Sequence, residues 1–226
     1  MTISFRPLRS TISGPVLALL TVALIALSMV ALGAPARAAG VQRTFSLSGT
    51  MEVGGPPALT LPAGSTLVAT IDPTSGAFSD GQLSIPTFDR GAVSGPQAEI
   101  TLTQIGAATG VLDPVTGVSS MTVTLEATLA VPLLPATCTI GPITSTSSSG
   151  GPGGSPFAGS PLTGTVTASG YTVPAAVGTV GSTTCGPASA AAINATLGLP
   201  TSATSISFTV VETTPAPGPI EPSYTG

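Results

Sequence analysis

Few kinds of side chain in this 226-residue sequence could take part in catalysis. There is no His and no Lys, which removes Ser-His-Asp, Cys-His and Ser-Lys catalysis together with Schiff-base chemistry. The acid–base groups that remain are nine carboxylates, spaced singly along the chain: Glu52, Asp72, Asp80, Asp89, Glu99, Asp113, Glu126, Glu212 and Glu221. A pair of them about 5 to 10 Å apart could hydrolyse a glycoside. Their wide spacing favours solvated side chains, so we expect no catalytic activity and keep a glycoside hydrolase as the less favoured alternative.

Calcium is the metal ion that such acidic turns could hold, with Asp72, Asp80 and Asp113 as the first candidates. The sequence has no Asp-x-Asp-x-Asp-Gly run, and the turns themselves account for these residues. We therefore expect no metal and no cofactor.

Cys138 and Cys185 are the only cysteines. In an oxidising compartment an even pair is most simply a disulfide, whereas a metal site would need further Cys or His ligands. Closing a loop of about fifty residues would stabilise the fold by roughly 4 kcal/mol in the chain-entropy model.

The N-terminus has the order of a secretory signal peptide. Two arginines precede an apolar run at 16–32, and Ala36 and Ala38 stand where the −3 and −1 residues of a cleavage site before Ala39 would be. We expect residues 1–38 to be removed, giving a secreted protein that is extracellular or associated with the cell wall. An uncleaved membrane anchor stays the alternative, because the run is at the short limit for spanning a bilayer.

The charge of the expected mature chain limits its partners. From residue 39 onward two arginines face nine carboxylates, a net charge of −7. Such a surface cannot neutralise phosphates, so we expect neither nucleic acid nor, after cleavage, a membrane as partner.

Strands must position these residues. Residues 121–131 alternate apolar and polar side chains, the period of a half-buried strand. Further strands are predicted at 44–53, 66–71, 77–85, 99–105, 110–112, 136–146, 162–168, 170–173 and 204–212. The pattern predicts an all-β fold, either an antiparallel β-sandwich or a partly closed barrel of about eight to ten strands.

Two similar turns separate some of these strands. Asp72 and Asp113 each precede Pro, and Gly76 and Gly117 end the turns, where glycine can take the left-handed conformation.

The remaining segments complete a single β domain at 39–214. The Ala-rich segment 187–197, between Gly-Pro and Gly, predicts the one short helix. The Ser, Gly and Pro of 145–161 predict a flexible surface loop, and 215–226 a Pro-rich tail.

The aromatic residues are the basis of a second functional hypothesis. A carbohydrate or cell-wall-polymer binding module would have a shallow groove lined by several of Phe45, Phe78, Phe88, Phe157 and Tyr171.

Three passages carry a resemblance to a known group. They are Thr-Ile-Asp and Thr-Ser-Gly within 70–76 with Leu-Ser-Ile-Pro at 83–86; Pro-Ala-Thr-Cys and Pro-Ile-Thr-Ser-Thr within 135–146; and Thr-Cys-Gly at 184–186 continuing to Ser-Ile-Ser-Phe-Thr at 205–209. In these passages the chain resembles secreted all-β actinobacterial proteins without an assigned activity. The resemblance implies a signal peptide and paired cysteines, and no catalytic residue. We therefore expect an exported structural or binding protein, whose partner would be a cell-wall polymer or another envelope protein.

Overall fold

The structure is a computed structural model that describes residues 40–55, 57–90, 98–131 and 136–213, all within one compact unit. The predicted signal peptide 1–38, with Ala36 and Ala38, lies outside the described residues, as do Ala39 and the tail 215–226. These predictions are therefore untested.

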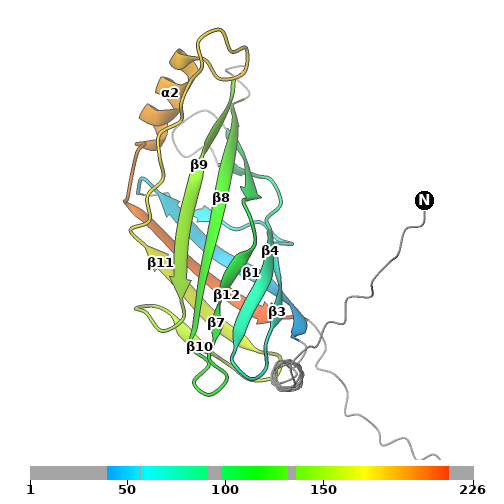
Figure 1. The fold of residues 1–226 in the computed structure, drawn as a ribbon. Coiled ribbons are helices and arrows are strands. Elements are labelled where there is room, and N and C mark those ends of the chain that lie inside the picture. Colours follow the sequence, from blue (N-terminus) through cyan, green and yellow to red (C-terminus); the bar gives the residue numbers. More distant parts are fainter. Residues whose placement is uncertain (1–39, 56, 91–97, 132–135, 214–226) are drawn as a thin grey trace, which may run out of the picture. The chain divides into compact units, whose positions relative to one another are not determined.

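Eight antiparallel strands form a closed barrel (Figure 1). Their order around the barrel is β11, β12, β1, β3, β4, β7, β8 and β9, and the pairing of Thr167 with Ser148 joins β9 back to β11. The strands are β1 (Val41–Val53), β3 (Thr66–Ile71), β4 (Ala77–Ser84), β7 (Ala108–Leu112), β8 (Ser119–Val131), β9 (Ala136–Ser148), β11 (Thr163–Ser169) and β12 (Thr204–Glu212). The all-β prediction is confirmed, and of its two architectures the barrel is the one observed.

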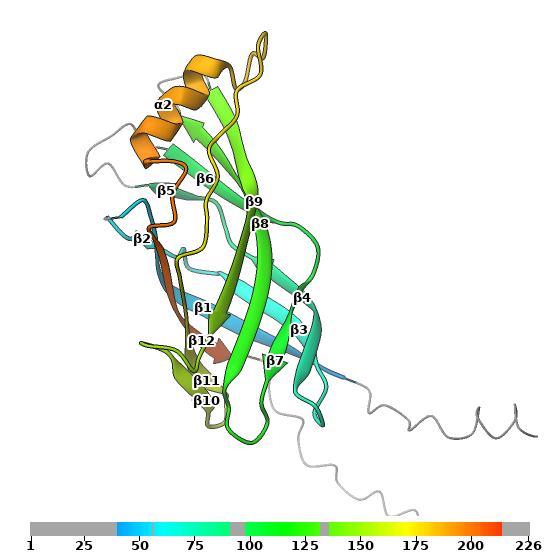
Figure 2. The ribbon, with the colours of Figure 1, turned by 60° about the vertical axis from the view of Figure 1, so that its left-hand side comes forward.

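Four short strands extend this barrel. They are β2 (Leu59–Thr60) on β1, β10 (Ser155–Ala158) on β11, β6 (Ala98–Gln104) on β8, and β5 (Phe88–Arg90) on β6. One edge of β8 pairs with β7 at 119–122 and with β6 at 125–130. The same long strand thus belongs to the barrel at one end and to a side sheet at the other, and this side sheet lies in the half of the fold that carries the helix (Figure 2).

The helix α2 (Pro187–Leu197) has the predicted bounds. It starts after Gly186 and ends at Gly198, whose left-handed backbone (φ 64°) closes the last turn. Ala190 and Ile193 are its buried residues. They pack with β6, β8 and β9 in a core next to the one inside the barrel, which centres on residues such as Phe45, Leu67 and Phe208.

The predicted disulfide is present. Cys138 of β9 is bonded to Cys185, with 5.0 Å between their Cα atoms. Cys185 lies two residues before α2, so the bond fixes the start of the helix to the barrel.

The two predicted turns are also confirmed. Asp72 Oδ1 accepts a hydrogen bond from Thr74 N (2.8 Å), and Asp113 Oδ1 accepts one from Val115 N (2.8 Å). Gly76 and Gly117 have φ of 70° and 71°, as such turns require.

The structure corrects two predicted segments. Residues 145–148 of the expected loop 145–161 continue β9, and residues 155–158 form β10. The strand expected at 170–173 is absent among the described residues, because Val173 makes only an isolated bridge to Thr201.

Candidate ligand-binding cavity

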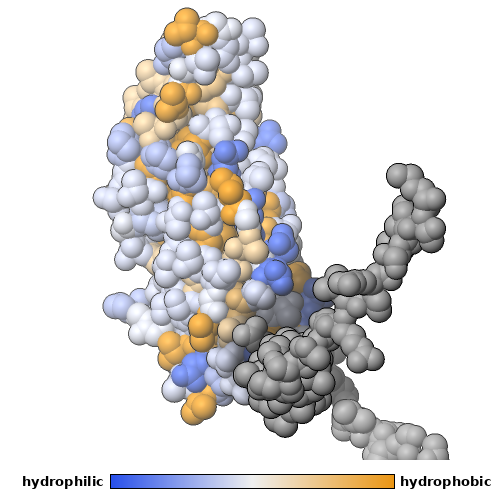
Figure 3. All heavy atoms as spheres, in the orientation of Figure 1, coloured by the Kyte–Doolittle hydropathy of each residue, from blue (hydrophilic) through white to orange (hydrophobic). Residues whose placement is uncertain are grey.

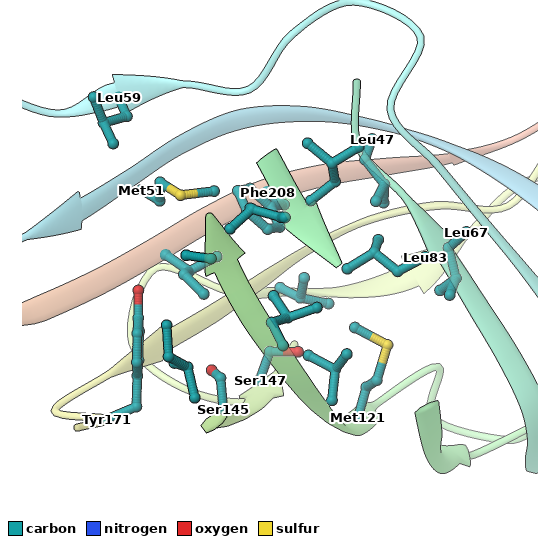
Figure 4. A pocket seen from close by; sticks show the side chains of 18 of the residues that line it. Leu47, Met51, Leu59, Leu67, Leu83, Met121, Ser145, Ser147, Tyr171 and Phe208 are labelled. Carbon is teal, nitrogen blue, oxygen red and sulfur yellow. The ribbon is translucent and has the colours of Figure 1, made fainter. Parts of the chain in front are cut away.

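A cavity of about 160 Å³ lies in the interior of the barrel and is also lined by side chains of β2, β5, β6 and α2. All eight barrel strands contribute inward-facing side chains to it, because alternate residues of a strand point to one face. An eight-stranded barrel is just wide enough to hold one small ligand when side chains leave its centre open. The cavity is therefore the candidate site (Figure 4).

Its walls are almost entirely apolar. Leu, Ile, Val, Met and Phe side chains dominate, and the residues with polar side-chain atoms are Ser119, Ser145, Ser147 and Tyr171. No charged residue is among the described residues that line the cavity. Such a wall favours a neutral, apolar molecule, since an ion would lose its hydration without a counter-charge.

Two of the serines stand out. Ser145 and Ser147 are alternate residues of β9, exposed by only 5% and 6%, and both side chains lie at the cavity (Figure 4). Their Oγ atoms have no hydrogen-bond partner among the described residues. A buried hydroxyl in that position costs free energy unless a molecule in the cavity bonds to it.

Tyr171 adds a third polar group. Burial raises the pKa of its phenol from 10.0 to about 12, because the surrounding protein disfavours the charged phenolate. The hydroxyl is therefore neutral at physiological pH and can take part in hydrogen bonds without bringing a charge into the cavity.

The strand β10 contributes an aromatic side chain to the wall. Phe157 N donates a hydrogen bond to Gly117 O (2.8 Å), which ties β10 to the Asp113 turn. The ring lies over Gly164 of β11, where a Cβ atom would come within 2.9 Å of it. Glycine at 164 thus makes room for the ring.

The side chain of Gln104 joins two strands that lack a backbone ladder. Its Oε1 accepts from Leu83 N (2.5 Å), while its Nε2 donates to Gly81 O (2.7 Å) and Gly106 O (2.6 Å). These bonds connect β4 to the end of β6, where β8 changes partner from β7 to β6. The Gln104 amide therefore supplies hydrogen bonds between β4 and β6 in place of a backbone ladder.

The carboxylates of the described residues are not among those that line the cavity. Glu212 is buried, where it accepts hydrogen bonds from Arg43 and from Leu162 N (3.2 Å) and so links β12 to β1. Hydrogen bonds from Thr116 N and then Val115 N hold the pKa of Asp113 below its usual value. Asp80 is exposed, and within the described ranges no cluster of His, Cys, Asp or Glu could hold a metal ion.

The five aromatic residues proposed for a sugar groove line the interior instead. Phe45 and Phe78 are buried, and Phe88, Phe157 and Tyr171 also contribute to the cavity wall. The expected shallow groove is therefore not formed by these side chains.

Sequence reasoning placed Ser147 in the loop 145–161 and Ser145 where this loop overlaps the end of the predicted strand 136–146, and it singled out neither residue. Thr144 and Thr146 alternate with them, so hydroxyl residues occupy both faces of β9 and no apolar period is visible. The available signal was the neighbouring strand, since Val123 and Met121 pair with Ser145 and Ser147 on its apolar face.

Comparison of the chain with protein-family models, curated proteins and solved structures finds no match. The resemblance to secreted actinobacterial proteins stays a prediction. Among the described residues, no helix has both the length and the apolar character needed to cross a bilayer.

Proposed function

We propose that this is an exported binding protein that holds one small apolar molecule inside its barrel. The observation that carries the proposal is the cavity of about 160 Å³ with an apolar wall. Enclosing an apolar molecule there would remove its surface from water, at roughly 25 cal/mol for each Å² buried.

The disulfide supports the exported part of the proposal. Disulfides persist mainly in oxidising compartments, and the bond between Cys138 and Cys185 fits such a location. The face shown in Figure 3 carries few strongly hydrophilic residues, in keeping with the low charge of the chain.

The proposal assigns binding and no reaction to the cavity. Acid–base catalysis needs a titratable group near the reacting atoms, and the cavity wall offers the Tyr171 phenol with a pKa of about 12. A cell-wall polymer or an envelope protein as partner of the outer surface stays a separate prediction.

Naphthalene binding tests the proposal. The chain has no Trp, so naphthalene fluorescence can be followed over a weak tyrosine background. We expect saturable binding of one naphthalene per chain to the purified, oxidised protein. Absence of saturable binding, together with a native circular-dichroism spectrum, would contradict the proposal.

A matched pair of variants locates the bound molecule. Met121 faces the cavity from β8, while its neighbour Ser120 is exposed on the opposite face. Met121→Phe narrows the cavity without adding a Trp to the fluorescence background and should abolish naphthalene binding, whereas Ser120→Phe should leave it unchanged. Leu67→Phe provides a second filling variant in case Met121→Phe does not fold.

A further inference from the structure

The inward face of β9 changes character along its length. Cys138, Ile140 and Ile143 are buried and apolar, and the next two inward residues are Ser145 and Ser147. Across the strand pair, these serines lie opposite Val123 and Met121 of β8. Two hydroxyls therefore interrupt the apolar inward face of β9.

On the outward face of the same strands, the threonine hydroxyls do have hydrogen-bond partners. Thr144 and Thr146 bond to Thr124 and Thr122 through their side-chain oxygens, at 3.0 and 2.9 Å. Ser145 and Ser147 have no such partner among the described residues, although both are buried. Places where a sequence departs from its own core pattern in this way are commonly functional sites.

The composition of the cavity wall limits which chemical groups of a ligand can bond to these serines. A serine hydroxyl donates one hydrogen bond and accepts others, so it can serve either an alcohol or a carbonyl oxygen. A carboxylate or an ammonium group would be desolvated with no opposite charge in the described cavity wall. The ligand group that suits these serines is therefore the oxygen of a neutral alcohol or carbonyl.

The volume of the cavity limits the size of the rest of the ligand. A cavity of about 150 Å³ with an apolar wall can hold benzene. The cavity here, at about 160 Å³, is of the same order and suits a body of one or two rings or a short chain.

From the two inward serines in this apolar cavity, we infer that the ligand is a compact neutral molecule whose single hydroxyl or carbonyl oxygen bonds to Ser145, Ser147 or both. The inference rests on the proposed function and specifies its ligand class. Alternate strand residues are about 6.6 Å apart along the strand, which exceeds the span of two hydrogen bonds of about 2.8 Å. One ligand oxygen therefore bonds to both serines only where their hydroxyls lean toward each other, and otherwise bonds to one of them. The remaining surface of the molecule contacts the apolar wall.

Three probes with the same ring system test the inference: naphthalene, 2-naphthol and 2-naphthoate. The measured quantity is the ratio of the naphthalene Kd to the 2-naphthol Kd, because a ratio within one protein cancels differences in folded fraction. We expect Ser145→Ala/Ser147→Ala to lower this ratio roughly fivefold or more relative to the wild type, with naphthalene affinity kept or increased. We expect no binding of 2-naphthoate to either protein.

Thr144→Ala/Thr146→Ala is the matched control, since it removes two hydroxyls from the outward face of the same strand. It should leave the ratio unchanged. A ratio that the serine variant does not alter, or 2-naphthoate binding as tight as that of 2-naphthol, would overturn the inference. If neither naphthalene nor 2-naphthol binds the wild type, the proposed function itself fails.

A stability measurement gives a readout that needs no ligand. Removing hydroxyls without a protein partner should shift the urea midpoint of the ligand-free serine variant upward, while the threonine variant should shift downward. A downward shift for both would assign the serines a structural role and contradict the inference.

Discussion

The ring of Phe157 meets the ring of Phe45 edge-on, with 6.4 Å between centroids and 75° between planes. This contact joins β10 to β1 at the cavity wall. Phe157→Ala should lower the free energy of unfolding by about 2 kcal/mol, less than for a fully buried ring, because the side chain is half-buried. Urea unfolding measures the loss, and Phe157→Leu should recover most of it. Equal stability of Phe157→Ala and wild type would show that β10 contributes nothing to the wall.

The Gln104 amide holds β4 to β6 through the backbone groups of Leu83 and Gly81. Gln104→Leu keeps the size of the side chain but leaves Leu83 N and Gly81 O without their hydrogen-bond partner. We therefore expect the free energy of unfolding to fall by about 1–3 kcal/mol. Amide hydrogen exchange at Leu83 should also become faster. Gln82→Leu, at an exposed position of β4, is the control and should change neither quantity. Unchanged exchange at Leu83 would contradict the assigned role.

The raised pKa of Tyr171, about 12, makes alkaline stability a test of its burial. Between the ordinary phenol pKa of 10.0 and about 12, the folded protein keeps the phenolic proton while the unfolded chain loses it. The free energy of unfolding should therefore fall as pH rises through this window, and more steeply for wild type than for Tyr171→Phe. The difference in absorbance at 295 nm between the two proteins should titrate near 12. A midpoint near 10 would place the phenol in water.

The disulfide closes a loop with a sequence separation of 47. Loss of the bond should cost about 4 kcal/mol in the chain-entropy model. Cys138→Ala/Cys185→Ala and the reduced wild type should both show a lowered urea midpoint, measured against the oxidised protein. Reduction without any change in midpoint would show that the bond does not constrain the fold.

Parts of this structure follow from local sequence patterns. The bounds of β3, α2 and β12 were predicted correctly, because a strict period of two marks the strands and glycines flank the helix. The pairing of the cysteines followed from their number.

Other parts depend on contacts that no local pattern shows. Closure of the barrel rests on the pairing of Thr167 with Ser148, and the amide of Gln104 bridges β4 to β6. The cavity serines were missed because hydroxyl residues occupy both faces of β9. A sandwich and a barrel have the same strand periodicity, so the sequence left both open.

Methionine methyl groups offer the most direct test of binding inside the barrel. Met51 and Met121 both line the cavity, whereas Val115 and Val180 are exposed by 90% and 87% on the outer surface. With ¹³C-labelled methionine and valine methyl groups and saturating naphthalene, we predict intermolecular nuclear Overhauser effects to Met51 and Met121 and none to Val115 or Val180. Effects confined to the exposed valines, or absent at both methionines, would contradict a ligand site within the barrel.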